Sequence, residues 1–275
     1  MTASPDHQDR VRVSADGAEL EAPLDEALRT VRAEGGHVDG IARQGEWALT
    51  EYGDREYDHP DTRPRMRGWL HLFAFFGSIV AAAVLIPLAF VEGVRAGVAV
   101  TVYCLTILGL FGVSALYHRR RWSPRAWKLM KRADHSMIFL FIAGTYTPFA
   151  RLAVPETTGW WMLGIVWAGA LAGVALKMIW PTAPRWVGVP IYLALGWVSV
   201  FVLGDILSLV GVTVLVLMAT GGVLYSVGAI AYATKRPNPW PGTFGYHEVF
   251  HAMTIVAATC HYIAVYFALY NSPFV

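Results

Sequence analysis

The sequence predicts an all-α, polytopic membrane protein built as a bundle of seven transmembrane helices. The chain has 275 residues, of which 55% are hydrophobic and only 15% are charged. From Trp69 onward it consists of apolar blocks of about 20 residues, the length that a helix needs to cross a bilayer. The charges are unevenly placed, since 15 of the 20 acidic residues lie in residues 1–62. The sequence therefore divides into an acidic tail, residues 1–62, and a membrane domain, residues 63–275.

The acidic tail is rich in Asp, Glu and Gly, a composition typical of disorder. We expect it to be mostly disordered and cytoplasmic. A short amphipathic helix is expected within Pro23–Arg32, because Leu24, Leu28 and Val31 recur at helical spacing. The net charge of +2 averages this acidic tail against a basic membrane domain, so it does not indicate nucleic-acid binding.

The apolar blocks define seven expected spans, and the cationic residues between them define their orientation. The spans are placed at 69–91, 96–117, 134–153, 159–180, 186–204, 206–233 and 245–270. Connections on one side carry 14 Lys and Arg residues, whereas those on the other side carry only Arg95 and Arg151. Because cytoplasmic connections are enriched in Lys and Arg, this imbalance predicts a cytoplasmic N-terminus and an external C-terminus. The expected location is the cell membrane, with several crossings.

The last span opens with two histidines, His247 and His251, spaced four residues apart. On a helix they share one face, with about 6 Å of axial rise between them, so both can reach one transition metal. A single pair of this kind also occurs as ordinary polar residues on an amphipathic helix. Further ligands at the same depth would decide between these readings.

Other polar groups are expected at the same depth, just inside the cytoplasmic boundary of the membrane. His118 ends the second span, with Ser114 one turn deeper on the same face, and Asp134 opens the third span. Three histidines, one carboxylate and one hydroxyl therefore converge in the predicted topology. Ionisable groups within membranes usually pair or mark function, which favours a shared metal site. Groups near helix ends also reach interfacial water, so their presence alone does not require a function.

A site of this composition has a specific chemistry. Three neutral imidazoles leave the fourth position of a tetrahedral Zn²⁺ open to water, and zinc lowers the pKa of that water to about 7. We assign metal binding to His118, His247 and His251, proton acceptance to Asp134, and support of these groups to Ser114. Other first-row divalent metals also suit an imidazole-rich site.

We expect the remaining polar residues of the membrane domain to have roles other than metal binding. His135 is expected beside the site or at the interface rather than as a ligand, and Glu248 is expected to face away from the histidines. His261, about 15 Å deeper than His251, reads as an interhelical hydrogen-bonding residue that could also line an interior cavity. Asp205 is expected to cap the sixth span, and Gly144-Thr145-Tyr146-Thr147-Pro148 is expected to pack closely or to line a substrate cavity.

Four motifs together resemble the hemolysin III family, which belongs with the progestin and adipoQ receptors and the alkaline ceramidases. They are Ser114-x-x-x-His118, Arg132-Ala133-Asp134-His135-Ser136, Ala143-Gly144-Thr145-Tyr146-Thr147-Pro148 and His247-Glu248-Val249-Phe250-His251. The resemblance covers roughly residues 63–271 and leaves the acidic tail outside. It implies a seven-helix fold with a cytoplasmic N-terminus, a zinc held by His118, His247 and His251, and a water contacted by Asp134 with Ser114 alongside. It also implies hydrolysis of a lipid amide and a role in membrane-lipid homeostasis.

Three hypotheses for function follow from these observations. The first is a zinc-dependent hydrolase of a lipid-derived amide or ester, with membrane lipids and a lipid-like substrate as its partners. The second is a membrane sensor or receptor-like regulator in which the zinc is structural. The third, a cytolytic pore, rests on the family's name alone, because the spans lack the charged stripe of a water-filled path.

Overall fold

The computed structural model describes most of the chain outside the tail. The described residues are 64–120, 122–180 and 183–275, with short pieces at 10–15, 18–23, 29–30, 38–43 and 46–48. They belong to two compact units, Met1–Arg63 with Arg121–Trp127, and Pro64–Arg120 with Lys128–Val275.

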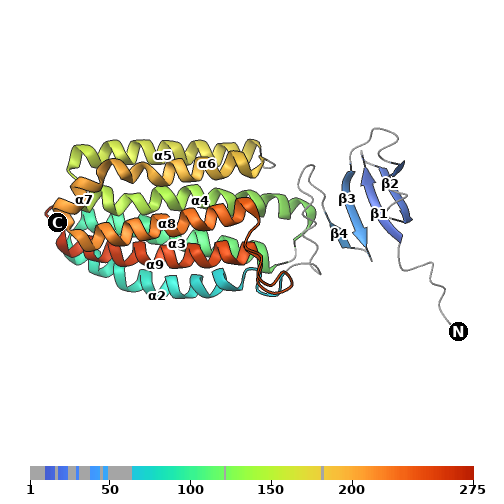
Figure 1. The fold of residues 1–275 in the computed structure, drawn as a ribbon, viewed down its shortest axis with the longest axis horizontal. Helices are drawn as coiled ribbons and strands as arrows, with labels where there is room; N and C mark the ends of the chain where they lie inside the picture. Colours follow the sequence, from blue (N-terminus) through green and yellow to red (C-terminus); the bar gives the residue numbers. More distant parts are fainter. Residues whose placement is uncertain are drawn as a thin grey trace. The chain divides into compact units, whose positions relative to one another are not determined.

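The first unit contains four short antiparallel strands, which the sequence analysis did not anticipate. They are β1 (Arg10–Ala15), β2 (Ala18–Pro23), β3 (Val38–Arg43) and β4 (Glu46–Ala48), in the order β2-β1-β3-β4 (Figure 1). The expectation of a mostly disordered tail does not hold for these strands, and the all-α prediction applies only to the second unit. The missed signal is an alternation of apolar and polar residues on either side of Asp16-Gly17, a pattern typical of a β-hairpin.

The amphipathic helix expected in the tail is only partly testable. Pro23, the first residue of the expected range, ends β2 instead. Arg29 and Thr30 are helical, whereas residues 24–28 and 31–32 lie outside the described residues.

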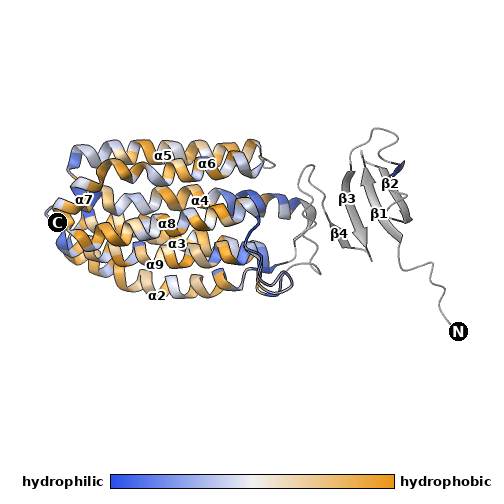
Figure 2. Ribbon diagram, viewed as in Figure 1, coloured by the Kyte–Doolittle hydropathy of each residue, from blue (hydrophilic) through white to orange (hydrophobic). Residues whose placement is uncertain are grey.

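The second unit is a bundle of long helices. Its elements are α2 (Trp69–Glu92), α3 (Val94–Arg119), α4 (Pro124–Leu152), α5 (Glu156–Ile179), α6 (Arg185–Gly196), the 3₁₀ helix η3 (Trp197–Val202), α7 (Leu203–Val210), α8 (Val212–Thr234) and α9 (Tyr246–Asn271). Among the helix pairs whose packing is described, α8 packs extensively on α9 and α2 on α3. Hydrophobic residues dominate these helices over most of their length, and hydrophilic residues gather at the start of α4 and before α9 (Figure 2). The described part of the chain is therefore a polytopic helical membrane protein.

Six helical segments of the described residues are long and apolar enough to cross a membrane. They are Trp69–Glu92, Val94–Arg119, Glu156–Ile179, Trp186–Val210, Val212–Thr234 and Tyr246–Asn271. The third expected span, 134–153, falls within α4, which is not among the six. Its first third carries a run of Arg and Lys residues and Asp134, which lower the hydropathy of the helix.

The boundary between the fifth and sixth expected spans was wrong by several residues. The span expected at 186–204 continues through η3 and α7 to Val210, and α8 begins only at Val212. The turn lies at Gly211, whose φ of 91° is a conformation that glycine adopts without a steric penalty. Asp205 therefore lies in the first turn of α7 and does not cap the sixth span, because the chain turns six residues later.

One buried ion pair fixes the start of α9. The Nε of Arg67, just before α2, donates to Oε1 of Glu248 at 2.6 Å, and 1% of the Glu248 side chain is exposed. The other carboxylate oxygen of Glu248 accepts a 2.8 Å bond from the N–H of Gly245. Backbone bonds from Arg65 to Gly242 and from Met66 to Thr243 join the same two segments. The segment before α2 therefore holds the segment that carries His247.

Candidate metal centre

The first two turns of α9 present two functional faces. His247 and His251 lie one turn apart on the face directed into the bundle, and both line an interior cavity. Glu248 is rotated about 100° from His247 and turns to Arg67. This separation confirms that Glu248 does not share the histidine face.

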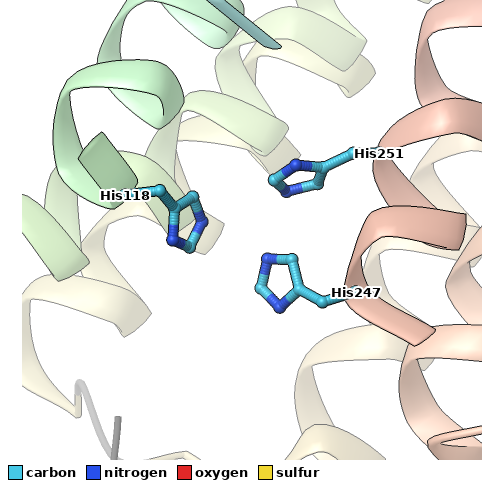
Figure 3. Close-up of side chains that lie close together, drawn as sticks. All are labelled: His118, His247 and His251. Carbon is cyan, nitrogen blue, oxygen red and sulfur yellow. The ribbon is translucent and has the colours of Figure 1, made fainter. Parts of the chain in front are cut away.

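The structure brings the three predicted histidines together. His118 from α3 and His247 and His251 from α9 direct their rings toward one another (Figure 3). One ring nitrogen of each lies within 4.8 Å of the others. His118 and His251 are buried and His247 is partly buried. Side chains far apart in the sequence therefore form one cluster.

Asp134 and Ser114 lie beside this cluster and line the same cavity. The hydroxyl of Ser114 donates a hydrogen bond to the carboxylate of Asp134. Because Ser114 and His118 are four residues apart on α3, this bond ties α4 to the helix that carries the first histidine. Both side chains therefore line the cavity that His247 and His251 line, and their roles at a metal site stay predictions.

A fourth histidine, His71 of α2, belongs to the same cluster but was not singled out from the sequence. Its ring stacks on that of His251, with centroids 3.7 Å apart and planes inclined by 12°. It is buried, and among the described residues neither of its ring nitrogens has a hydrogen-bond partner. An isolated ionisable residue in an otherwise apolar span was the available signal.

The cluster closes one end of an elongated apolar cavity of about 150 Å³. The walls come from α3, α4, α6, α8 and α9, with Leu110, Ile138, Phe141, Val189 and Phe250 among the apolar lining residues. Tyr146, Tyr225 and His261 also line it, toward the opposite end of α9. The arrangement combines a polar cluster with a long apolar compartment.

Two further histidines, His135 and His261, also line the cavity. His135 lines the cavity, but its Nδ1 contacts the carbonyl of Lys131 at 2.8 Å, and it lies outside the three-histidine group of the described residues. His261 makes the expected interhelical bond, from Nε2 to the carbonyl of Met218 at 3.2 Å.

The Gly144–Pro148 segment has both of its expected properties. A Cβ atom at Gly144 would lie 1.9 Å from Oγ1 of Thr106, so α3 and α4 approach closely there. Thr145 and Tyr146 line the cavity. Tyr146 also joins α4 to η3, because its hydroxyl donates to the carbonyl of Gly196 at 2.6 Å and accepts from the N–H of Ser199 at 2.9 Å.

The residues present fit a metal ion. Imidazole nitrogen is a preferred ligand of zinc and other first-row divalent ions, and three such ligands form the set of many catalytic zinc sites. The three nitrogens are mutually close and come from rigid helices rather than loops. The cluster can therefore hold a metal ion.

Comparison with known proteins identifies similar membrane proteins. The family model described as Haemolysin-III related matches residues 61–262. The chain is 30% identical to Hemolysin-3 of Bacillus cereus over 191 residues, which are 69% of this chain and 84% of that protein. It is 24% identical to the human monocyte to macrophage differentiation factor over 209 residues, 74% of this chain and 84% of that protein.

The fold and the site define a class of protein: a multi-pass helical membrane protein with a buried histidine cluster at the end of an apolar cavity. The family to which the chain belongs follows from how much of the chain the family model matches. The chain belongs to the Haemolysin-III related family.

Proposed function

We propose that this protein is a metal-dependent membrane hydrolase that cleaves an amide or ester bond of a lipid-derived substrate. The observation that carries the proposal is the cluster of His118, His247 and His251, with ring nitrogens within 4.8 Å, at the end of an apolar cavity that Asp134 also lines. A metal-binding group and a carboxylate beside it are the parts that hydrolysis of a carbonyl compound requires.

His118, His247 and His251 would hold the ion, with zinc as the first candidate because of the ligand type. When bound, such an ion supplies Lewis acidity, which makes water more acidic and polarises a carbonyl oxygen. The stacking of His71 on His251 would limit rotation of that ring and keep its nitrogen directed at the other two.

Asp134 would act as the proton acceptor and donor. It takes a proton from the attacking water as the oxygen bonds to the carbonyl carbon, and returns it to the leaving amine or alkoxide as the scissile bond breaks. The bond from Ser114 holds the carboxylate in place during both transfers. Water and the lipid are consumed, and a carboxylic acid with an amine or alcohol is released.

The apolar cavity would hold the acyl chain of the substrate. Its walls of Leu110, Ile138 and Phe141 are apolar and carry no competing nucleophile. With the substrate carbonyl next to the histidine cluster, the acyl chain would lie along α9.

The proposal includes a topology of seven crossings, with α4 as the third span despite its polar start. The 14 cationic residues on one side against Arg95 and Arg151 on the other favour a cytoplasmic N-terminus and a site near the cytoplasmic face. Labelling of single cysteines in intact cells tests this. Residue 122 should be protected from an impermeant reagent and residue 155 should react, and the reverse pattern would contradict the orientation.

Metal analysis of the purified protein tests the ligand set. We expect close to one zinc per chain, lost when both His247 and His251 are replaced by Ala. His135→Ala is the matched control, because it removes a cavity-lining histidine outside the cluster and should keep the metal. Full metal content in the double variant would show that the ligands are wrong.

Lipid analysis tests the reaction. Cells that carry the Asp134→Ala form should accumulate one lipid class relative to cells with the unchanged protein, while purified Asp134→Ala keeps its zinc. Retention of zinc with no change in any lipid would contradict hydrolysis and favour the sensor with a structural metal. Release of solutes from liposomes that the metal-site changes leave intact would favour the pore.

A further inference from the structure

A second polar cluster lies in the same cavity, away from the histidine triad. It consists of His261 on α9 and Tyr225 on α8, whose ring centroids are 5.3 Å apart at an angle of 66°. Among the described residues, neither Nδ1 of His261 nor the hydroxyl of Tyr225 has a hydrogen-bond partner, although both atoms are buried. Polar atoms left unpaired in an apolar cavity are costly, which indicates that a ligand group meets them.

The orientation of His261 is fixed by α8. Its Nε2 lies 3.2 Å from the carbonyl oxygen of Met218, an atom that only accepts, so Nε2 carries the proton in the neutral ring. A Cβ at Gly221 would lie 2.4 Å from His261, so the absence of a side chain there lets the ring approach the helix. The remaining nitrogen, Nδ1, is therefore held as a hydrogen-bond acceptor.

Tyr225 supplies the complementary function. Its phenolic O–H both donates and accepts, and it lines the same cavity as His261. A hydroxyl group placed between the two can donate its proton to Nδ1 of His261 and accept the proton of Tyr225. A carbonyl or ether oxygen would satisfy Tyr225 only, because it has no proton for His261.

The position of this pair relative to the metal centre defines the ligand further. His261 follows His251 by ten residues on the uninterrupted helix α9, a separation of about 15 Å. The cavity lining is mostly apolar, with Phe141, Ile142 and Leu110 among its residues. A ligand that occupies both ends therefore needs a polar group at the triad, a long apolar stretch, and one hydroxyl.

We propose that Tyr225 and His261 form a subsite that binds a hydroxyl group within the acyl chain of the lipid, about 15 Å from the carbonyl group at the metal centre. The inference rests on the proposed function for the placement of the carbonyl, but the subsite itself acts through binding and requires no turnover. It gives the cavity a preference for mid-chain hydroxylated acyl groups over plain ones.

Competitive displacement of a fluorescent fatty acid from the purified full-length protein tests the subsite. The probes are stearic acid, 12-hydroxystearic acid, whose hydroxyl lies near the middle of the chain, and 2-hydroxystearic acid, whose hydroxyl adjoins the carboxyl group. We expect 12-hydroxystearic acid to bind about tenfold more tightly than stearic acid, as one to two hydrogen bonds provide. The 2-hydroxy isomer should show no such gain.

Two variants assign the gain to the pair. Tyr225→Phe should reduce the preference to about twofold or less while keeping the affinity for stearic acid, which also reports that the variant is folded. His261→Leu removes the acceptor Nδ1 together with the bond to Met218, so it should have the same effect, and its affinity for stearic acid again reports that the variant is folded. Tyr270→Phe removes a hydroxyl from an exposed residue of α9 and serves as the matched control with an unchanged preference.

Equal affinities for stearic and 12-hydroxystearic acid would overturn the subsite. This result would show that water satisfies Nδ1 of His261 and the hydroxyl of Tyr225. It would leave the acyl cavity of the proposed hydrolase intact. Failure of all three acids to bind would overturn the subsite together with the acyl cavity. A preference that survives in both Tyr225→Phe and His261→Leu would also refute the assignment.

Discussion

Replacing Glu248 tests how the start of α9, and with it the metal centre, is held in place. Glu248 accepts from Arg67 at 2.6 Å, and the two side chains are 1% and 11% exposed. Glu248→Gln keeps an oxygen for the N–H of Gly245 but removes the negative charge. The guanidinium of Arg67 then loses its buried carboxylate partner, a change that costs about 3–5 kcal/mol.

Unfolding of the purified protein by SDS in mixed micelles, followed by its helical signal, measures this cost. Glu156→Gln is the matched control, because Glu156 also pairs with Arg95 and Arg151 but at 3.7 Å and with 61% of its side chain exposed. Exposed pairs contribute about 1 kcal/mol or less. Combining Glu248→Gln with Arg67→Met should cost about 1–3 kcal/mol less than the sum of the single changes. A cost for Glu248→Gln no larger than that of Glu156→Gln would refute the reasoning.

Three further predictions concern the site and its packing. His71→Phe should keep the metal, because a ring that stacks on His251 is retained. His71→Ala should weaken metal binding about 10–100-fold in a competition with a chelator. Equal metal binding by both variants would contradict a positioning role for His71. Gly144→Ala should destabilise the protein by about 1–3 kcal/mol through its clash with Thr106. Thr106→Ala should relieve only part of this cost, because Cβ of residue 106 stays 2.7 Å from the new Cβ. Gly164→Ala, with nothing within 4 Å of the new Cβ, should be neutral or stabilising in the same SDS unfolding assay. Metal content after dialysis should fall as the solution is acidified, because imidazole binds a metal only when it is neutral; a content that stays constant down to the pH at which the helical signal is lost would argue against an all-histidine site.

The metal centre was accessible from the sequence because its parts obey strong local rules. The His247-x-x-x-His251 spacing places two imidazoles on one helix face, and the Lys and Arg distribution predicts that His118 and Asp134 lie at the same depth. Neither rule involves the packing of side chains. These rules indicate which side chains can meet, whereas the approach of the three ring nitrogens to within 4.8 Å also depends on how α3 packs against α9.

The parts that escaped prediction depend on contacts or on weak signals. The stacking of His71 on His251 requires α2 and α9 to be neighbours, which no spacing within either helix reveals. The end of the fifth span was misplaced because Asp205 was read as a helix start, whereas Gly211 makes the turn. The strands of the tail were missed because its acidic composition outweighed a short alternating pattern.

The ion pair of Glu248 also bears on which carboxylate can take part in chemistry. Outside the acidic tail the chain has five carboxylates, and among the described residues only that of Asp134 lines the cavity that contains the histidines. Glu248, although adjacent to His247 in sequence, is committed to Arg67 and Gly245 and is rotated about 100° from His247 around α9. The first turns of α9 thus carry the clustered histidines on one face and an anchor on a neighbouring face. A charge change at Glu248 should therefore alter stability, while under the proposed function one at Asp134 should alter turnover. If Asp134→Asn and Glu248→Gln lowered turnover equally at matched stability, this separation of roles would be wrong.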